Sequence, residues 1–164
     1  MKVTAERIAL AKDAAVKALA ARDLTRAELT EHLVKKRFAP SVAEAALLEL
    51  ETLGVVDDDR VAEQYVERRL ADDSPTRAML ETELLERGIE AGLAASVLAE
   101  TVGVRDEGQE ALDLARDRVR RSRADLKPEV IRRRVYAFLA RRGYDEETCR
   151  HAVETAADEY LGRP

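Results

Sequence analysis

The chain has 164 residues, of which 46% are apolar, 37% charged and only 4% aromatic, and its formal net charge is −5. This composition fits a core of Leu, Val and Ala between helices, and the net charge argues against an indiscriminate nucleic-acid binder. The single cysteine excludes an internal disulfide, and no run of 18 uncharged apolar residues exists to span a membrane, so we expect a cytoplasmic protein.

The first twenty residues are rich in alanine and could be mistaken for a signal peptide. Charged residues interrupt any apolar h-region at Glu6, Arg7, Lys12, Asp13 and Lys17. Apolar residues recur close to helical spacing, and an amphipathic helix is therefore predicted from about Thr4 to Arg22.

Capping and turn signals divide the rest of the chain into eight further helices. Thr25 with Glu28 forms a capping-box pattern that opens the second helix, Pro40 is a first-turn proline for the third, and Gly54 ends it. The later helices are expected from Asp57-Asp58-Asp59, from Ser74-Pro75 to Arg87, from about Glu90 to Thr101, from about Arg105 to Arg121, from Pro128, and from an Asp145 cap to about Tyr160. The prediction is nine helices and no strands.

One helix-ending pattern occurs three times, around position 37, Gly88 and Gly143. The matching residues are Arg26, Leu29, Leu33, Lys36, Phe38 and Leu47; then Arg77, Leu80, Leu84, Arg87, Ile89 and Leu98; then Arg132, Val135, Leu139, Arg142, Tyr144 and Val153. The apolar residues before position 37, Gly88 or Gly143 form one stripe of a helix, and the glycine is the left-handed residue that ends the helix. Position 37 is Arg, which in that conformation costs roughly 1 to 2 kcal/mol, so the first copy is free to turn differently.

The repeated pattern predicts an all-α fold, an elongated curved array of three tandem three-helix repeats that resemble helix-turn-helix units. The expected repeats are residues 1–56, 57–104 and 105–164, which together form one continuous solenoid-like domain. If the register is right, Leu33, Leu84 and Leu139 are buried alike.

Basic residues gather near the end of the chain. The segment from Arg116 to Arg142 contains eleven basic and three acidic residues, a local excess of +8. The candidate basic face consists of Arg116, Arg120, Arg123, Arg132, Arg133, Arg134, Arg141 and Arg142. Guanidinium groups suit phosphates or the carboxylates of a partner. The alternative is a solvated face with intrahelical ion pairs, which the scarcity of acids in this run disfavours.

The remainder of the chain then carries −13, much of it in the middle. The candidate acidic partner-binding region consists of Asp57, Asp58, Asp59, Asp72, Asp73, Glu81 and Glu83. For Asp57 to Asp59 a metal or docking site is one interpretation. The preferred one is a helix N-terminus that favours negative charge.

Catalytic and metal-binding patterns are missing. Cys149 and His151 stand two residues apart, on different sides of a helix, and His32 is isolated, so we expect no metal, no cofactor and no enzyme. Tyr136 and Tyr144 could stack on bases, although their helical spacing favours packing.

Two stretches, within residues 53–70 and 133–144, carry glycine, arginine and aromatic patterns that resemble the RecX family of RecA regulators. The first, within residues 53–70, matches at Gly54, Val55, Val56, Asp57, Asp58, Arg60, Ala62, Tyr65 and Val66. The second matches at Arg133, Tyr136, Phe138, Leu139, Arg141, Arg142, Gly143 and Tyr144. The chain departs from the family pattern at Val61, Arg37 and Ala39, where Phe, Gly and an Asp cap are usual.

The resemblance covers essentially the whole chain and implies a regulator that binds the RecA nucleoprotein filament, typically in its helical groove. Such a regulator restrains ATP hydrolysis, strand exchange and the co-protease role, and so acts in recombination, DNA repair and the SOS response. We expect a monomer that binds single- or double-stranded DNA weakly and the filament more tightly. Two alternatives stay open: a helix-turn-helix DNA-binding protein, and a helical interaction scaffold unrelated to recombination.

Overall fold

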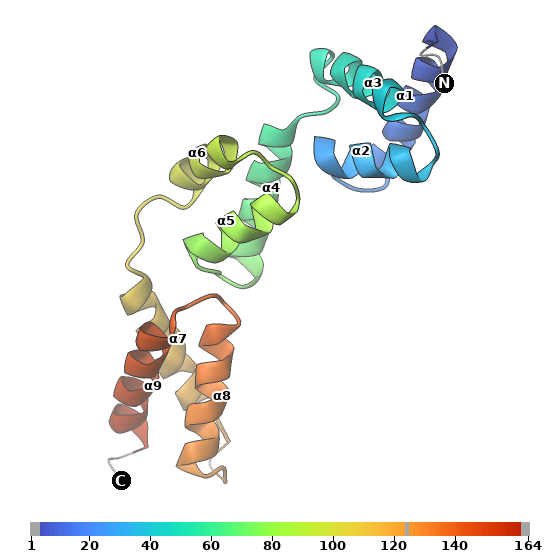
Figure 1. Cartoon of the computed structure of the whole chain (residues 1–164). Helices are drawn as coiled ribbons and strands as arrows, with labels where there is room; N and C mark the ends of the chain where they lie inside the picture. The colour runs from blue at the N-terminus through green and yellow to red at the C-terminus, as the bar shows by residue number, and fades with distance from the viewer. Residues whose placement is uncertain (1–3, 124, 162–164) are drawn as a thin grey trace. The chain divides into compact units, whose positions relative to one another are not determined.

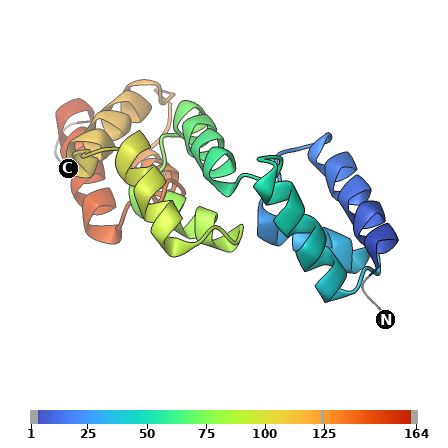
Figure 2. The same ribbon diagram turned by 90° about the horizontal axis from the view of Figure 1, so that it is seen from above.

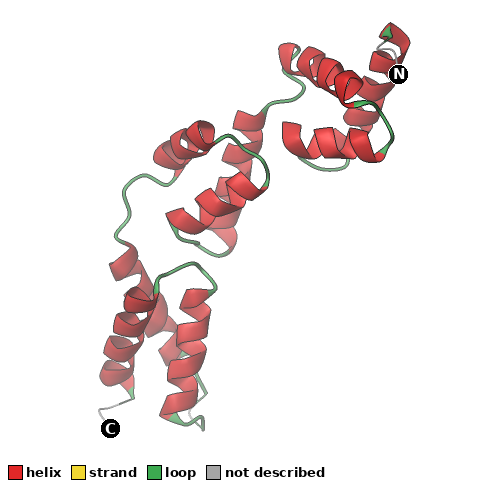
Figure 3. Cartoon of the chain, in the orientation of Figure 1, coloured by secondary structure: helices red, strands yellow, loops and turns green. Residues whose placement is uncertain are grey.

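A computed structural model describes residues 4–123 and 125–161, and over these residues the chain forms nine α-helices and no strand (Figures 1 and 3). The helices are α1 (Ala5–Leu19), α2 (Arg26–Lys35), α3 (Pro40–Thr52), α4 (Asp58–Asp72), α5 (Arg77–Glu86), α6 (Ala91–Thr101), α7 (Glu107–Arg120), α8 (Pro128–Ala140) and α9 (Glu146–Tyr160). The all-helical prediction is confirmed.

The helices belong to two compact units. The first unit runs up to Arg68 and resumes at Glu81–Thr101, and the second comprises Arg69–Leu80 and resumes at Val102. The boundary between the units runs through α4 and α5. The three repeat ranges and the curvature expected from the sequence stay predictions.

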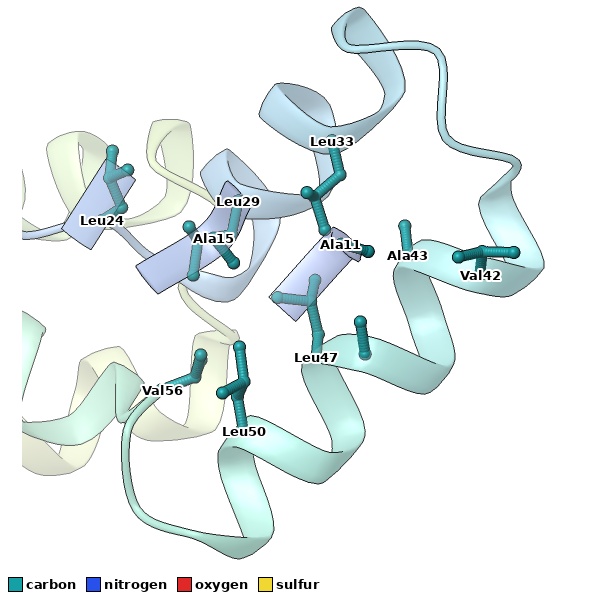
Figure 4. Packing of buried hydrophobic residues seen from close by; sticks show 11 residues of the cluster. Ala11, Ala15, Leu24, Leu29, Leu33, Val42, Ala43, Leu47, Leu50 and Val56 are labelled. Carbon is teal, nitrogen blue, oxygen red and sulfur yellow. The ribbon is translucent and has the colours of Figure 1, made fainter. Parts of the chain in front are cut away.

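The first unit contains a core formed where α1, α2 and α3 pack on one another (Figures 2 and 4). Figure 4 shows Leu29 and Leu33 of α2 directed toward Leu47 of α3 and the alanines of α1. The buried residues of α1 in this core are Ala11 and Ala15, and Ile8, Ala14, Ala18 and Leu19 pack against it while partly buried. Small side chains let the helices approach closely, so many short contacts replace a bulky aromatic centre.

The second unit has an equivalent core, formed where α7, α8 and α9 pack on one another. Ala111 and Ala115 supply the small residues from α7, and α8 supplies Val135 and Leu139. Leu33, Leu84 and Leu139 are all fully buried, which confirms the predicted register of the repeats.

Each repeated pattern ends its helix in the same way. Gly88 has a φ of 79° and Gly143 a φ of 89°. After α5 the Gly88 N–H donates to the Leu85 carbonyl, and the Ile89 N–H donates back to the Leu84 carbonyl at 3.0 Å. This pair of bonds is a Schellman motif, which satisfies carbonyls that the end of a helix leaves without partners.

Arg37 turns as the two glycines do. Its φ is 66°, and the Phe38 N–H donates to the Leu33 carbonyl at 3.1 Å, so α2 also ends in a Schellman motif. The different turn that the sequence allowed for the first copy does not occur. The first copy therefore bears the strain of a left-handed arginine.

One helix start differs in detail from the sequence expectation. The capping box of Thr25 and Glu28 is present and Pro40 opens α3, both as predicted, and Ala39 provides no side-chain cap for α3. Helix α5 begins at Arg77, with the Thr76 hydroxyl accepting the Met79 N–H, rather than at Ser74-Pro75. Ser74 itself has a φ of 47° and cannot start a helix in that conformation.

In the first unit, the N-terminus of α2 meets the turn between α5 and α6. The Thr25 hydroxyl, which is fully buried, donates to the Arg87 carbonyl at 2.7 Å. A Cβ on Gly88 would lie 2.3 Å from the Cβ of Ala27. Glycine is thus required at position 88 for two reasons, its positive φ and this close approach. We call this packing of a helix N-terminus against the left-handed turn at the end of another helix a joint.

Ionic groups complete this joint. The Arg87 guanidinium donates to both carboxylate oxygens of Glu28, at 3.0 and 2.8 Å, and to the Asp23 carbonyl. Burial alone would raise the pKa of the Glu28 carboxyl, but hydrogen bonds from Arg87 and from the Thr25 N–H outweigh it and lower the pKa. The Asp58 carboxylate, at the start of α4, accepts the Arg26 N–H at 2.7 Å.

The second unit contains a second joint of the same design, between the N-terminus of α5 and the turn from α8 to α9. The Thr76 N–H donates to the Arg142 carbonyl at 2.9 Å, and the Thr76 hydroxyl donates to the Gly143 carbonyl. A Cβ on Gly143 would lie 2.6 Å from that hydroxyl. The Arg77 N–H is accepted by Glu107, at the start of α7.

Candidate partner-binding surface

The predicted basic face lies entirely within the second unit, on α7, α8 and the segment that joins them. The eight arginines do not behave alike, because several of them bind acidic residues of the same unit.

Four of the eight arginines are held by carboxylates. Arg116 donates to both oxygens of Glu159 on α9, at 2.8 and 2.7 Å, and these hydrogen bonds raise the pKa of the guanidinium. Arg132 lies 3.9 Å from Asp158, and Arg123 pairs with Asp125. Arg142 binds the carbonyl and carboxylate of Asp73. Arg116, Arg132 and Arg142 thus bind residues on other segments of the unit, whereas the Arg123–Asp125 pair is local and exposed.

Aromatic rings contact two of the eight arginines. The Arg120 guanidinium lies 5.6 Å from the centre of the Tyr160 ring, and Arg142 lies 3.8 Å from the centre of the Phe138 ring. Both distances are within the range of a cation–π contact. Tyr160 is exposed, so the Arg120 pair stays accessible at the surface.

Two arginines of α8 and its C-cap residue, Arg141, remain available. Arg133, Arg134 and Arg141 are exposed and make no hydrogen bond or ion pair with any residue that the structure describes. They stand on the side of α8 opposite Ile131, Val135 and Leu139, which are buried. Along an α-helix the seven positions from Arg134 to Arg141 bring the two side chains to nearly the same face, about 10 Å apart.

The acidic candidates divide between the two units. Asp57, Asp58, Asp59, Glu81 and Glu83 belong to the first unit, and Asp72 and Asp73 to the second. Asp57 accepts the Arg60 N–H, and Asp58 accepts the Arg26 N–H. These two carboxylates cap helices, as the preferred sequence interpretation expected.

The remaining acids of this set have different surroundings. Glu83 accepts the Tyr65 hydroxyl at 3.0 Å, and Asp73 is bound by Arg69 and Arg142. Asp59, Asp72 and Glu81 are exposed, and the described residues offer them no partner. These last three are the acids free to meet another molecule.

Neither histidine nor the cysteine forms a reactive cluster. Cys149 is fully buried, and burial raises the pKa of its thiol, which disfavours the reactive thiolate. No group of three metal-binding side chains occurs within residues 4–123 and 125–161. Over the same residues, no helix combines the length and the apolar character needed to cross a membrane.

The tyrosines singled out from the sequence differ in exposure. Tyr144 is buried and follows the left-handed turn, whereas Tyr136 on α8 is 37% exposed. Tyr136 stands three positions after Arg133, which makes the two residues neighbours on the helix surface. Only Tyr136 is therefore placed to touch a partner.

Comparisons with known proteins agree with this architecture. Residues 11–50 match the first three-helix domain of RecX, and residues 106–153 match the third three-helix domain of RecX. These ranges cover parts of α1 to α3 and of α7 to α9, the helices that build the two cores.

Curated relatives resemble most of the chain. The regulatory protein RecX of Mycolicibacterium smegmatis is 35% identical over 139 residues, which cover 83% of this chain and 73% of that protein. The regulatory protein RecX of Mycobacterium leprae is 36% identical over 142 residues, or 86% of this chain and 82% of that protein.

A solved structure supports the fold. The crystal structure of RecX from Lactobacillus salivarius superposes with a TM-score of 0.69 at 18% identity, and the match covers 93% of this chain and 98% of that one. Together with the sequence relatives, this establishes that the chain belongs to the RecX family of regulatory proteins.

Proposed function

We propose that this member of the RecX family engages the RecA–DNA filament through the exposed arginines of α8. Family membership makes the chain a regulator of RecA rather than an enzyme, acting on ATP hydrolysis, strand exchange and the co-protease role. The contact surface, the part played by DNA and the oligomeric state are the proposed elements.

The observation that carries the proposal is the contrast among the basic residues. Arg116, Arg132 and Arg142 already bind carboxylates of their own unit, whereas Arg133, Arg134 and Arg141 have no such partner among the described residues. Unpaired guanidinium groups on a rigid helix are pre-organised for phosphates or carboxylates of another molecule.

The exposed acids add a second kind of contact. Asp59 and Glu81 in the first unit and Asp72 in the second have no partner among the described residues. A filament presents both DNA phosphates and protein, so basic and acidic residues of the regulator have complementary targets there. Such complementarity mainly raises the association rate and fixes the orientation.

We also propose that the chain acts as a monomer in the cytoplasm, where filaments form on chromosomal DNA. A joint of the same design between two copies would lack its parts, because Arg37 replaces the glycine at the first copy of the turn and Lys127, not a threonine, precedes α8.

The test is DNA-dependent ATP hydrolysis by the cognate RecA, measured with substoichiometric amounts of this chain. We expect inhibition by the unmodified chain and at least a tenfold higher half-inhibitory concentration for R133E/R134E/R141E. The matched control is K35E/R60E/R150E, which makes the same charge change at other exposed positions and should inhibit normally.

Circular dichroism should show unchanged helicity for both triple variants. Inhibition that survives in R133E/R134E/R141E would remove α8 from the proposal and leave the family activity in place. Absence of inhibition by the unmodified chain would contradict a direct action on RecA ATP hydrolysis.

A further inference from the structure

A shallow hollow of about 370 Å³ lies between α1 and α2 in the first unit. Its lining residues are Leu10, Asp13, Ala14, Lys17, Ala18, His32 and Lys36. Three of them can carry positive charge and only one is acidic. Lys17 and Lys36 are exposed and form no ion pair with any described residue.

The 51-residue period relates this hollow to another one, lined by Tyr65, Arg68 and Arg87. Ala14, Lys17 and Lys36 stand 51 residues before those three in the sequence. The buried residues obey the same period, because Ala11 and Ala15 of α1 correspond to Ala62 and Val66 of α4.

The second hollow is closed by the preceding copy, whereas the first is not. Arg22, Asp23 and Glu28 form the remaining wall of the second hollow, and Glu28 binds Arg87 with both carboxylate oxygens. Every lining residue of the first hollow comes from α1 or the α2 segment itself. The first hollow therefore has the form of a joint without its incoming helix.

We propose that this hollow is a docking site for the N-terminal turn of a helix on a partner protein, with a carboxylate at the third helical position. In the first joint, Glu28 occupies that position of α2 and meets Arg87. In the docking site Lys36 replaces Arg87 and Lys17 lies beside it, so a carboxylate arriving in the same way meets two ammonium groups.

Arg37 adds a condition on the partner. Its φ of 66° is close to the 79° of Gly88, so its Cβ points as a Cβ on Gly88 would. In the first joint, a Cβ on Gly88 would lie 2.3 Å from the Cβ of Ala27 but 3.9 Å from its Cα. The incoming helix must therefore carry glycine at its second position.

A second copy of this chain does not meet these requirements. Its α2 N-terminus is already engaged in the first joint, and its α5 N-terminus in the second. Helix α8 begins at Pro128, so its third helical position is Val130, which carries no carboxylate. The occupant is thus a different protein, and the inference does not depend on the proposed function.

The probe is a synthetic peptide that copies residues 22–35 with Ala27→Gly, followed by an alanine-rich extension that supports the helix. Two-dimensional NMR of the full-length chain labelled with ¹⁵N should show shifts at Ala14, Lys17, His32 and Lys36 on titration. Binding should weaken at least fivefold with a Glu28→Gln peptide and with K17E/K36E, but not with K35E, whose lysine pairs with Glu31 on the α2 surface.

Two peptides, with Ala or Gly at position 27, test the role of Arg37. A peptide that keeps Ala27 should bind the unmodified chain at least fivefold more weakly than the glycine peptide, and R37G should remove that difference. Absence of shifts at millimolar peptide, or shifts confined to α8, would overturn the proposal. Equal binding of the Glu28→Gln peptide, or the same shifts with inorganic phosphate alone, would instead indicate a general polar or anion site and would also overturn it.

Discussion

Four of the residues that hold positive φ after a helix do so in different surroundings. Gly54 has a φ of 67° and a Cβ there would meet nothing within 4 Å, so only the backbone conformation favours glycine. Gly88 has the same kind of φ and also touches Ala27. Arg37 bears the backbone strain of the left-handed conformation, but within the described chain no incoming helix excludes its Cβ. Gly143 resembles Gly88, because a Cβ there would lie 2.6 Å from the Thr76 hydroxyl.

Substitution of these glycines by alanine should separate strain from steric exclusion. Gly54→Ala should cost about 1 kcal/mol from the left-handed backbone, whereas Gly88→Ala should cost about 2 to 4 kcal/mol, because Ala27 must also move. Urea unfolding of both variants measures the difference. Equal losses would mean that α2 shifts freely at the first joint.

The Glu28 carboxyl should make the first joint sensitive to acid. Its pKa is lower in the folded chain than in the unfolded chain, because hydrogen bonds from Arg87 and the Thr25 N–H outweigh its burial. A lowered pKa stabilises the folded state above the unfolded pKa of about 4.3, and this stability is lost as pH falls through the folded pKa.

Glu28→Gln should therefore reduce the loss of unfolding free energy between about pH 5 and pH 3. Asp58 acts in the opposite sense, because its burial raises its pKa and protonation of that carboxyl favours the folded chain. Urea titrations of the unmodified chain and the variant at several pH values give the comparison. Parallel pH profiles would show that the Arg87 contact contributes little.

Helices α2, α5 and α8 each bury one leucine shortly before the left-handed turn that ends the helix. Leu33, Leu84 and Leu139 are fully buried, and the Leu33 and Leu84 carbonyls also accept the N–H that closes the Schellman motif. The buried side chain and the hydrogen-bonded carbonyl of the same leucine thus both stabilise the C-terminal end of the helix.

Replacement of each of these leucines by alanine should lower the free energy of unfolding by roughly 2 to 5 kcal/mol, through lost burial and a residual cavity. Leu48 on α3 is 58% exposed and serves as the control, since Leu48→Ala should change stability by less than about 0.5 kcal/mol. Denaturant unfolding of the four variants checks the repeat register. A small loss at only one buried position would indicate that its repeat packs differently.

For the chain as a whole, the distribution of charge matters more than the net value of −5. Residues 116–142 carry an excess of +8, and the remainder carries −13. Internal pairs hold part of the positive charge, since Arg116 and Arg142 bind acids outside that segment. Fewer positive charges are therefore available to DNA than the sequence count suggests.

Binding to naked DNA should accordingly be weak and steeply salt-dependent, with a dissociation constant of about 10⁻⁴ to 10⁻⁶ M at physiological salt. Binding to the assembled ATP-state RecA filament should be much tighter, because protein surface there meets the exposed acids as well. Fluorescence anisotropy at one salt concentration compares the two. Equal affinities would favour the alternative of a helix-turn-helix DNA-binding protein.

Local patterns in the sequence were sufficient for the helices and most of their ends. Caps such as Thr25 and Asp145, the apolar spacing of α8 and the left-handed Gly88 and Gly143 depend on neighbours within a few positions and are confirmed, whereas the start of α5 and the turn at Arg37 differ from the expectation. The buried leucines follow from the same periodicity. Exposure of Arg133, Arg134 and Arg141 also followed from helical spacing alone.

Only the tertiary structure decided which charges are free. The few acids within residues 116–142 predicted that most arginines of this segment have no partner. In the structure, Arg116 binds Glu159, which is 43 residues away, and Arg142 binds Asp73, which is 69 residues away. The Glu28–Arg87 pair spans 59 residues. No local rule reaches across such separations, because these groups meet only after the helices have packed.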